Sequence, residues 1–411
     1  DAFGIALDNN NNVLTVGAFS DTMDVNPLAG EELLISPNSR DGFTQKLDAD
    51  GNFLWANHIT GTGQNQTYSV TTDAAGNVYT TGHFQNTADF DNGSGTTLTT
   101  GFNRLNSFIQ KIDPNGNLLW VKDIGSDNGT SSGKLIKIDD SGNIYSAGFF
   151  FDTIDYDPGP GVAMLMSLGD NNGWDIYIQK LDANGNFVWA KSFGGVERES
   201  VEGLDLDSEG NIYLTGEFLE TANFNTGTGI NNLISQGDRD AYVLKLDNDG
   251  NFVWVKQIGG TERDTGTEIK VSSNDNVYAL GNFSDVVDFD PGTGIENATS
   301  NGDYDNYILQ LDSDGNFVSN ITNGGTERDF IYGIATDDME NAYVTGSYRQ
   351  TVDFDPEANV NEFTAISASD AFVLKLKYND EETSISSLGP NESFSIYPNP
   401  NNGQFQIDFN D

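Results

Sequence analysis

The chain has 411 residues, of which 63 are acidic and 19 are basic, so its formal net charge at neutral pH is −44. A field of that sign repels nucleic acid and anionic membranes, which excludes both as expected partners. Cysteine is absent, which excludes disulfides and thiolate metal sites, and no apolar run is long enough to span a membrane. Aromatic residues make up 11% and glycines number 46, a composition that favours short strands and tight turns.

One hairpin pattern recurs along the chain, and residues 245–254 show it most clearly. Apolar side chains alternate up to Leu246, a turn of sequence Asp-Asn-Asp-Gly-Asn follows, and alternation resumes at Phe252. Gly250 can adopt positive φ and Asp247 can accept backbone N–H groups, which predicts a type I turn closed by a glycine bulge. The turn glycines given this structural role are Gly51, Gly116, Gly185, Gly250 and Gly315.

The spacing of these hairpins indicates a repeat architecture. The leading aspartates of five copies lie 65, 69, 65 and 65 residues apart, and a sixth copy begins at residue 371 and stops at 377. Each repeat also holds an upstream hairpin, such as residues 206–216, so it has four strands, named a, b, c and d. This predicts an all-β fold, a β-propeller of six four-stranded repeats of about 65 residues over residues 1–377.

The connections suggest where function would lie. The a–b and c–d turns are tight, whereas the b–c connection has about 20 residues and the d–a connection is short. We expect the tight turns at one face and the b–c and d–a loops at the other. That second face is the candidate functional surface, because loops on a rigid scaffold commonly carry function.

Both ends of the chain depart from the repeat. Asp1 falls where a strand d would just have ended, without Met or a signal peptide, and the sixth repeat lacks its strand d. We therefore expect a fragment or a processed product, with an upstream segment completing the last blade. Residues 378–392 are polar and predict a linker. Residues 393–411 form a separate terminal segment.

This terminal segment carries the first of two family resemblances. Tyr397-Pro398-Asn399-Pro400, followed by Asn402-Gly403 and alternating apolar residues, resembles the start of the C-terminal sorting domain of type IX secretion cargo in Bacteroidota. The resemblance implies a truncated β-sandwich sorting domain. It also implies a secreted or cell-surface location, reached by contact with the secretion machinery through a complete domain.

The repeats carry the second resemblance. Gly-Asn-x-Tyr-x-Thr-Gly at residues 210–216, Gly259-Gly260 and the stretch Asp240 to Leu246 are similar to SBBP-type β-propeller repeats of secreted bacterial proteins. This resemblance covers residues 1–377 and implies fold and secretion more than activity.

A tryptophan recurs at one strand position. A large ring there can pack between adjacent blades, while Asp…Gly…Trp also looks like the docking motif of quinoprotein propellers. The spacing differs from that motif by one residue, and no vicinal cysteine pair is present, so packing is favoured. The residues are Trp55, Trp120, Trp189 and Trp254.

An acidic pair opens the b–c loop of several repeats. Residues two apart on a strand share a face, so both carboxylates point together and the aromatic residue between them points inward. Clustered oxygens suit calcium, the one metal considered, although Asp before Pro is also a turn former. The candidate ligands are Asp89, Asp91, Asp155, Asp157, Asp288, Asp290, Asp353 and Asp355. The first repeat has Asp24 and Asn26 at these positions, and the fourth has Asn223 and Asn225.

The d–a loop carries an arginine between acidic residues, at Arg198, Arg263 and Arg328. These arginines either neutralise neighbouring loops, the favoured interpretation, or bind a ligand. His58 and His83 do not recur and have no motif partner, so packing or surface roles are expected.

No catalytic constellation is evident in the sequence. We therefore expect a non-enzymatic, monomeric, secreted or surface module that binds an extracellular glycan or protein. One alternative is a glycan hydrolase or lyase that uses the b–c loop carboxylates, since such chemistry needs two carboxylates beside a sugar. A pocket where non-repeated acidic and aromatic residues converge would favour the enzyme. The other alternative is a structural spacer.

Overall fold

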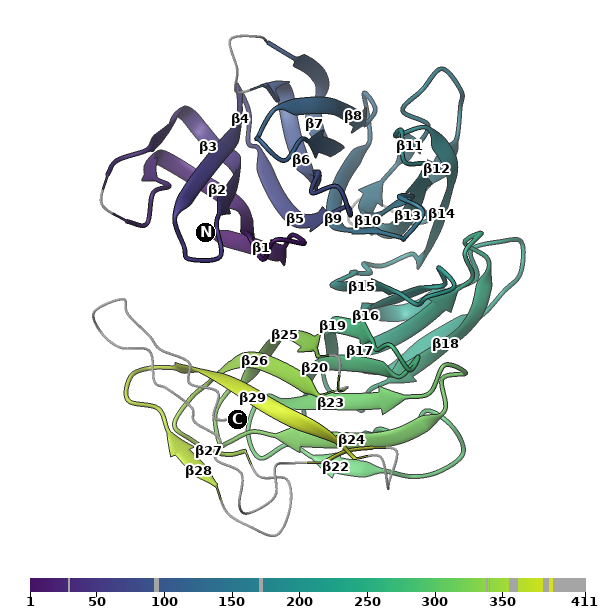
Figure 1. The fold of residues 1–411 in the computed structure, drawn as a ribbon. Helices are drawn as coiled ribbons and strands as arrows, with labels where there is room; N and C mark the ends of the chain where they lie inside the picture. The colour runs from purple at the N-terminus through teal and green to yellow at the C-terminus, as the bar shows by residue number, and fades with distance from the viewer. Residues whose placement is uncertain are drawn as a thin grey trace. The chain divides into compact units, whose positions relative to one another are not determined.

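The computed structural model describes residues 1–28, 30–91, 96–169, 173–337, 339, 341–354, 361–379 and 384–386. They belong to two compact units, unit 1 spanning residues 1–201 and unit 2 beginning at residue 202. Within these described ranges every regular element is a β-strand (Figure 1). No helix there is long and apolar enough to cross a membrane.

Unit 1 contains three groups of four antiparallel strands, called sheets below, each with its strands in the order a, b, c, d. Residues 60–61 also pair with residues 88–89, which joins the first two groups. The first sheet is β1 (Ala2–Leu7), β2 (Val13–Asp24), β3 (Leu33–Leu47) and β4 (Phe53–Gly61). The second is β5 (Gln66–Thr72), β6 (Val78–Asp89), β7 (Leu98–Ile112) and β8 (Leu118–Ile124). The third is β9 (Thr130–Ile138), β10 (Ile144–Phe151), β13 (Asp175–Leu181) and β14 (Phe187–Gly195).

Unit 2 repeats the arrangement. The fourth sheet is β15 (Gly203–Leu206), β16 (Ile212–Asn223), β17 (Asn232–Leu246) and β18 (Phe252–Ile258). The fifth is β19 (Thr265–Val271), β20 (Val277–Phe283), β23 (Asp305–Leu311) and β24 (Phe317–Asn323). The sixth is β25 (Phe330–Thr336), β26 (Ala342–Tyr348), β29 (Asp370–Asn379) and β30 (Ser384–Ser386).

The sixth sheet ends differently from the others. Its strand c pairs with β26 over Asp370–Leu376, whereas β30 pairs only with residues 377–379, beyond that segment. The three-residue β30 lies inside the stretch 378–392 that the sequence assigned to a linker. Residues 393–411, with the sorting motif, lie outside the described residues.

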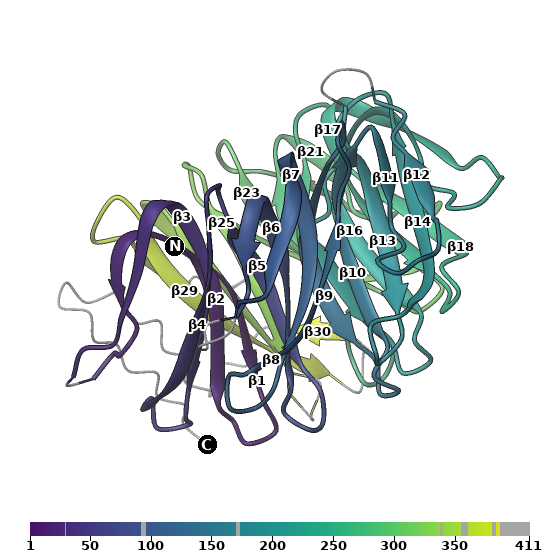
Figure 2. The same ribbon diagram turned by 90° about the horizontal axis from the view of Figure 1, so that it is seen from above.

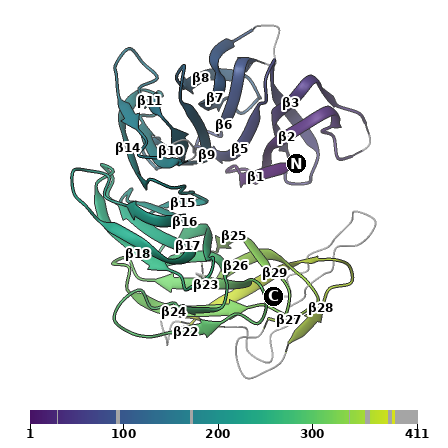
Figure 3. The same cartoon turned by 180° about the vertical axis from the view of Figure 1, so that it is seen from behind.

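The b–c connection of every repeat contains a two-stranded ribbon. In the first, second and fourth sheets the ribbon extends strands b and c, as where Asp21–Asp24 pairs with Leu33–Ser36. In the others it is a separate pair, namely β11 (Thr153–Asp155) with β12 (Met164–Met166), β21 (Val286–Asp288) with β22 (Asn297–Thr299), and β27 (Thr351–Asp353) with β28 (Glu362–Thr364) (Figures 2 and 3).

A residue with positive φ separates strand b from its ribbon in all six repeats. None of the six is glycine, although positive φ is uncommon for other residues and asparagine and aspartate tolerate it best. Their φ angles lie between 52° and 66°, at Asp21, Asn86, Asp152, Glu220, Asp285 and Gln350. The sequence pattern did not reveal this bend, which redirects the chain into the ribbon.

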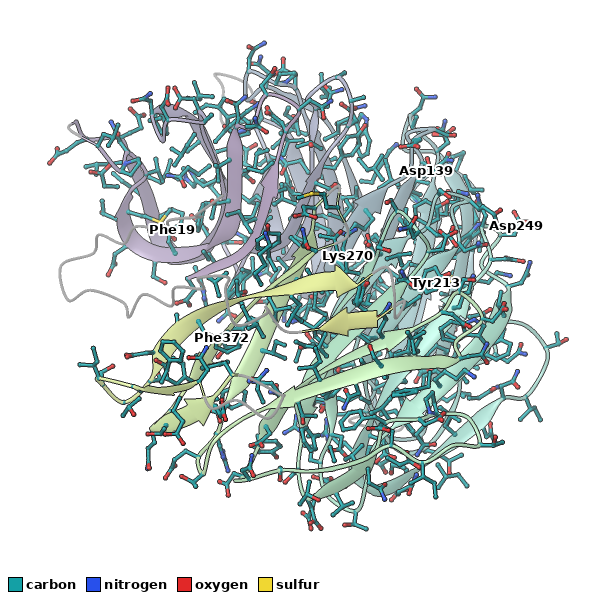
Figure 4. All side chains as sticks on the ribbon, turned by 60° about the horizontal axis from the view of Figure 1, so that its bottom comes forward. Phe19, Asp139, Tyr213, Asp249, Lys270 and Phe372 are labelled. Atoms are coloured by element: carbon teal, nitrogen blue, oxygen red, sulfur yellow. The ribbon has the colours of Figure 1, made fainter. Side chains whose placement is uncertain are left out.

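The c–d turns confirm the predicted glycine bulge. Asp247 Oδ1 accepts the N–H groups of Asp249 at 3.0 Å and Asn251 at 2.8 Å, and Gly250 has φ of 74°. The strand register shifts between Lys245 and Leu246, as a bulge requires. Figure 4 shows Asp249 at the tip of this turn.

Trp55, Trp120 and Trp254 each pack on the turn glycine of the following sheet, namely Gly116, Gly185 and Gly315. Trp254 Nε1 donates to the Ser313 carbonyl at 3.2 Å, and a Cβ on Gly315 would lie 3.1 Å from the ring. Trp55 Nε1 makes the equivalent bond to the Pro114 carbonyl at 3.0 Å. The four tryptophan side chains are half-buried rather than fully buried.

Candidate functional site

The acidic pairs of the b–c loops are engaged by the backbone. Asp288 Oδ1 accepts the N–H groups of Asp290 at 3.1 Å and Glu296 at 2.8 Å, which joins the two strands of the ribbon. Asp290 Oδ1 accepts the N–H of Gly292 at 2.7 Å. The aromatic residue between them, Phe289, is fully buried, as the alternation predicted. The pair therefore acts as a strand cap and a turn former.

The fourth repeat shows that a negative charge is not needed for this role. Asn223 Oδ1 accepts the N–H groups of Asn225 at 3.1 Å and Asn231 at 2.9 Å, and Asn225 Oδ1 accepts that of Gly227 at 2.9 Å. The same bonds form with neutral amides. Among the described residues no three His, Asp, Glu or Cys side chains gather in a way that could hold a metal ion. Asp355 lies outside the described residues, and calcium binding stays a prediction.

The loop arginines contact side chains of their own unit. Arg263 binds Glu217 through Nε at 3.1 Å and through Nη2 at 2.9 Å. The guanidinium carbon of Arg198 lies 4.4 Å from the ring centre of Trp174. Arg328 pairs with the exposed Asp303 at 3.1 Å. Arg263 and Arg328 thus each contact a carboxylate, whereas Arg198 contacts an aromatic ring. Ligand binding by these arginines stays a prediction.

A buried acid ends each of three d–a loops. Glu199, Asp264 and Asp329 donate their backbone N–H to the carbonyl of the residue before the strand c aspartate, at 2.7–3.1 Å; these residues are Trp174, Arg239 and Tyr304. Their carboxylates accept an N–H from the second glycine of the loop, as Asp264 Oδ2 does from Gly260 at 2.7 Å. Burial, which a neighbouring carboxylate reinforces, raises the pKa of Asp264 to about 7 and that of Glu199 to about 9.

The Gly-Gly pair is explained by close packing at this loop. A Cβ on Gly259 would lie 2.4 Å from Cγ of Asp240, and a Cβ on Gly260 would lie 2.3 Å from the Val286 carbonyl oxygen. A side chain at either position would clash. The first glycine therefore lets the backbone pack against Asp240, and the second lets it pack against the ribbon of the next repeat.

Each of these loop acids faces an aspartate at the start of strand c. Asp175, Asp240 and Asp305 are 0–2% exposed, and burial raises the pKa of all three. Both members of each pair stand in recurring sequence patterns, the first in Asp-x-Tyr and the second in Glu-Arg-acid. Sequence reasoning missed the pairing because about 24 residues separate the two positions.

His83 is buried and His58 is partly buried. His83 Nδ1 lies 3.0 Å from Ser132 Oγ, and both residues are buried. Burial, with the charges of Lys134 and Arg40, lowers the pKa of His83 to about 4. His58 packs edge-on against Phe19. The serine–histidine contact is closed to solvent, which suits the packing role.

Two shallow polar hollows of about 450 Å³ each lie among the described residues, one in each unit. In unit 1 it lies at the turn end, lined by residues that include Asn10, Trp55 and Asn115. In unit 2 it lies at the loop end, lined by residues that include Glu327, Arg349 and Gln350. Neither hollow brings together the non-repeated acidic and aromatic side chains expected of a glycan-cleaving site.

The ribbons expose apolar side chains. Met164 and Met166 on β12 are 59% and 68% exposed, while Leu165 between them packs inward. Other repeats expose a large aliphatic residue on or beside the second ribbon strand, at Leu33, Ile35, Leu98, Ile230, Ile234, Ile295 and Ile366.

The comparisons with known proteins are distant. No family model matches the chain, so the SBBP and type IX resemblances stay predictions. An uncharacterized WD repeat-containing protein of Acanthamoeba polyphaga mimivirus is 25% identical over 409 residues, covering 84% of this chain and 29% of that protein. The regulatory protein FlaEY of Caulobacter vibrioides is 25% identical over 142 residues, covering 34% of this chain and 14% of that protein.

The chain therefore spans less than a third of the length of these relatives. Among solved structures, a Bacteroides caccae protein of unknown function aligns with a TM-score of 0.37 at 10% identity, covering 80% of this chain and 81% of that one. Sqt1 of Chaetomium thermophilum aligns with a TM-score of 0.32 at 10% identity, covering 89% and 96%. The repeated four-stranded sheets and the WD-repeat likeness indicate a repeat protein of the β-propeller type.

Proposed function

We propose that the protein is a non-enzymatic, secreted or cell-surface interaction module, a six-bladed β-propeller that binds a protein partner through its b–c ribbons. The observation that carries the proposal is the set of apolar side chains that these ribbons expose in an otherwise strongly acidic chain. The distant likeness to a WD repeat protein supports an interaction role.

The third repeat offers the most continuous surface. Val162, Met164, Met166 and Leu168 alternate along the ribbon, so they lie on one face, and each is at least 59% exposed. Contiguous exposed apolar residues mark interaction sites, and flexible methionines adapt to varied partners. We define these four residues as the ribbon face.

The negative charge of the chain indicates which kind of partner would bind. Asp152, Asp155 and Asp157 lie on the same ribbon, and the net charge is −44. A second copy of this chain would be repelled, whereas a basic segment would be attracted. The occupant is therefore a protein segment with apolar residues at alternate positions and flanking Lys or Arg.

A peptide array tests the proposal. Labelled protein should bind basic peptides with alternating apolar residues, and binding should weaken as salt is raised from about 0.05 to 0.5 M. The variant Met164→Ser with Met166→Ser should bind at least about tenfold more weakly at unchanged melting temperature. The control Val188→Ser removes an apolar residue that is 47% exposed on β14, and it should bind normally.

Other outcomes would overturn this assignment. If the double methionine variant and the Val188→Ser control bound the peptides equally well, the ribbon face would not be the binding site. Binding to a glycan array at the hollow that contains Trp55, lost in Trp55→Ala, would favour glycan recognition. Glycan cleavage by the protein would favour the alternative hypothesis of an enzyme. The carboxylates considered for that activity accept hydrogen bonds from backbone N–H groups.

The location is part of the proposal and rests on the motif at residues 397–400. Expression of the complete gene in bacteria with and without a type IX secretion system tests it. Protein that reaches the medium or surface only when the system is present would support it, and retention in both strains would refute it.

A further inference from the structure

Repeats three, four and five each place two carboxyl groups together at the d–a loop. The pairs are Asp175 with Glu199, Asp240 with Asp264, and Asp305 with Asp329. In the third repeat, Asp175 Oδ1 and Glu199 Oε2 both lie within 3.0 Å of the point that a Cβ on Gly194 would occupy. All six residues are at most 4% exposed.

One oxygen of each strand c aspartate has no hydrogen-bond partner. Asp240 Oδ2 accepts the N–H of Gln236 at 3.1 Å and Nε2 of Gln257 at 2.5 Å, while Oδ1 is buried and unpaired. Oδ1 of Asp175 and of Asp305 is unpaired in the same way. A buried charged oxygen without a donor is unfavourable, so three copies of the same orphan need a cause.

The first repeat has a hydrogen-bond donor next to the equivalent aspartate oxygen. There the loop residue is Asn65, whose N–H bonds the Arg40 carbonyl at 2.8 Å, as Asp264 bonds that of Arg239. Asn65 Nδ2 donates to Asp41 Oδ1 at 3.3 Å. An amide hydrogen thus fills the place that is empty in the three acidic pairs.

We propose that repeats three, four and five each hold one proton between their two buried carboxyl groups, where repeat one holds an amide hydrogen. The strand c aspartate donates this proton from Oδ1 to the loop carboxylate, which already accepts one or two backbone N–H groups. Asp264 accepts from Gly260 and Ser284, and Asp329 from Gly325 and Arg349. The proton therefore ties strand c to the loop.

The surrounding charges agree with a retained proton. Glu262 and Tyr307 face Asp264, Glu197 faces Glu199, and Glu327 faces Asp329. The charge of Arg349 lowers the pKa of Asp329, while Arg263 and Arg239 bind Glu217. Mostly negative neighbours and burial disfavour a second ionisation.

The sign of the pH effect follows. The pKa values are raised in the folded state, so the stabilisation is fully present below the unfolded carboxyl pKa of about 4. It is lost as pH rises through the folded pKa values of the strand c aspartates, about 7 for Asp175 and about 6 for Asp305. Between these limits each pair makes the unfolding equilibrium constant rise up to tenfold per pH unit.

The variant Asp240→Asn tests the proposal in urea unfolding from pH 5 to 8. The amide keeps an acceptor for Gln236 and supplies its own hydrogen to Asp264, as Asn65 does to Asp41. The slope of the logarithm of the unfolding constant against pH should fall by up to one unit. The control Asp249→Asn removes an exposed carboxylate of the same repeat and should leave the slope unchanged.

The converse variant Asn65→Asp builds a pair in repeat one and should steepen the slope by up to one unit. Asp305→Asn replaces Asp240→Asn if the latter does not fold. Unchanged slopes in these variants would overturn the proposal. It would also fail if calcium raised the melting temperature at pH 8 and Asp240→Asn abolished that rise, since the pair would then hold a cation.

Discussion

Replacing Trp254 with alanine should measure how strongly consecutive sheets are joined. The indole packs on Gly315 of the next repeat, meets Tyr213 edge-on at 6.1 Å between ring centres, and donates to Ser313 at 3.2 Å. Complete burial of such a ring corresponds to a loss of about 3–5 kcal/mol on truncation. Half of that for a half-buried ring, with about 1 kcal/mol for the hydrogen bond, gives about 2.5–3.5 kcal/mol.

Thermal and urea unfolding would check this value. For a unit of this size the melting temperature should fall by roughly 5–14 °C. Trp254→Phe keeps one ring but loses the N–H donor, so its loss should be about half as large. Val253→Ala is the matched control, because Val253 is the neighbouring strand residue and is 46% exposed. If Trp254→Ala costs no more than Val253→Ala, the rings do not join the sheets and the packing argument fails.

Three further predictions concern single residues. Gly250→Val should lower the free energy of unfolding by about 1–3 kcal/mol, because φ at this position is 74°. Gly250→Asn should lower it less, since Asn11 has a φ of 59° at the equivalent a–b position. Equal melting temperatures of the two variants would contradict the argument from backbone strain. Asp288→Asn with Asp290→Asn should fold normally, as Asn223 and Asn225 do, and a calcium-specific rise in melting temperature lost in this variant would instead establish a metal site. Burial alone would raise the pKa of Asp8, but hydrogen bonds from Lys46 and Asn12 lower it to about 2, so its stabilisation is present above pH 4 and lost as pH falls towards 2; an acid unfolding curve unchanged by Asp8→Asn would contradict this.

The strands and tight turns were predictable because their causes are local. Alternation fixes which side chains are buried, and the turn of Asp247 needs only its own next four residues. The repeat of 65 residues then predicts similar sheets without any knowledge of long-range contacts. The positive φ at Asp21 and its equivalents had no such signal, since several residue types occupy the position.

The carboxyl pairs were hidden for a different reason. Asp240 and Asp264 meet only because strand d carries the chain away and the loop returns it to the start of strand c. Each residue alone fits a solvated acidic surface, which is the natural reading of a chain with net charge −44. Burial distinguishes them, and burial here follows from two glycines that permit close packing.

Comparison among the repeats separates structural residues from functional ones without any other sequence. Where asparagine replaces aspartate and the same bonds form, as at Asn223, the charge is not required. In the first repeat an amide N–H of Asn65 donates to the strand c aspartate. The equivalent aspartate oxygen has no hydrogen-bond partner in three other repeats, and we infer that a proton on the carboxyl group takes the place of the amide hydrogen there. A surface that differs between repeats cannot be explained by the common fold. The ribbon face is such a surface, because its methionines occur in the third repeat while isoleucine stands on other ribbons, and specificity for one partner would have to arise there.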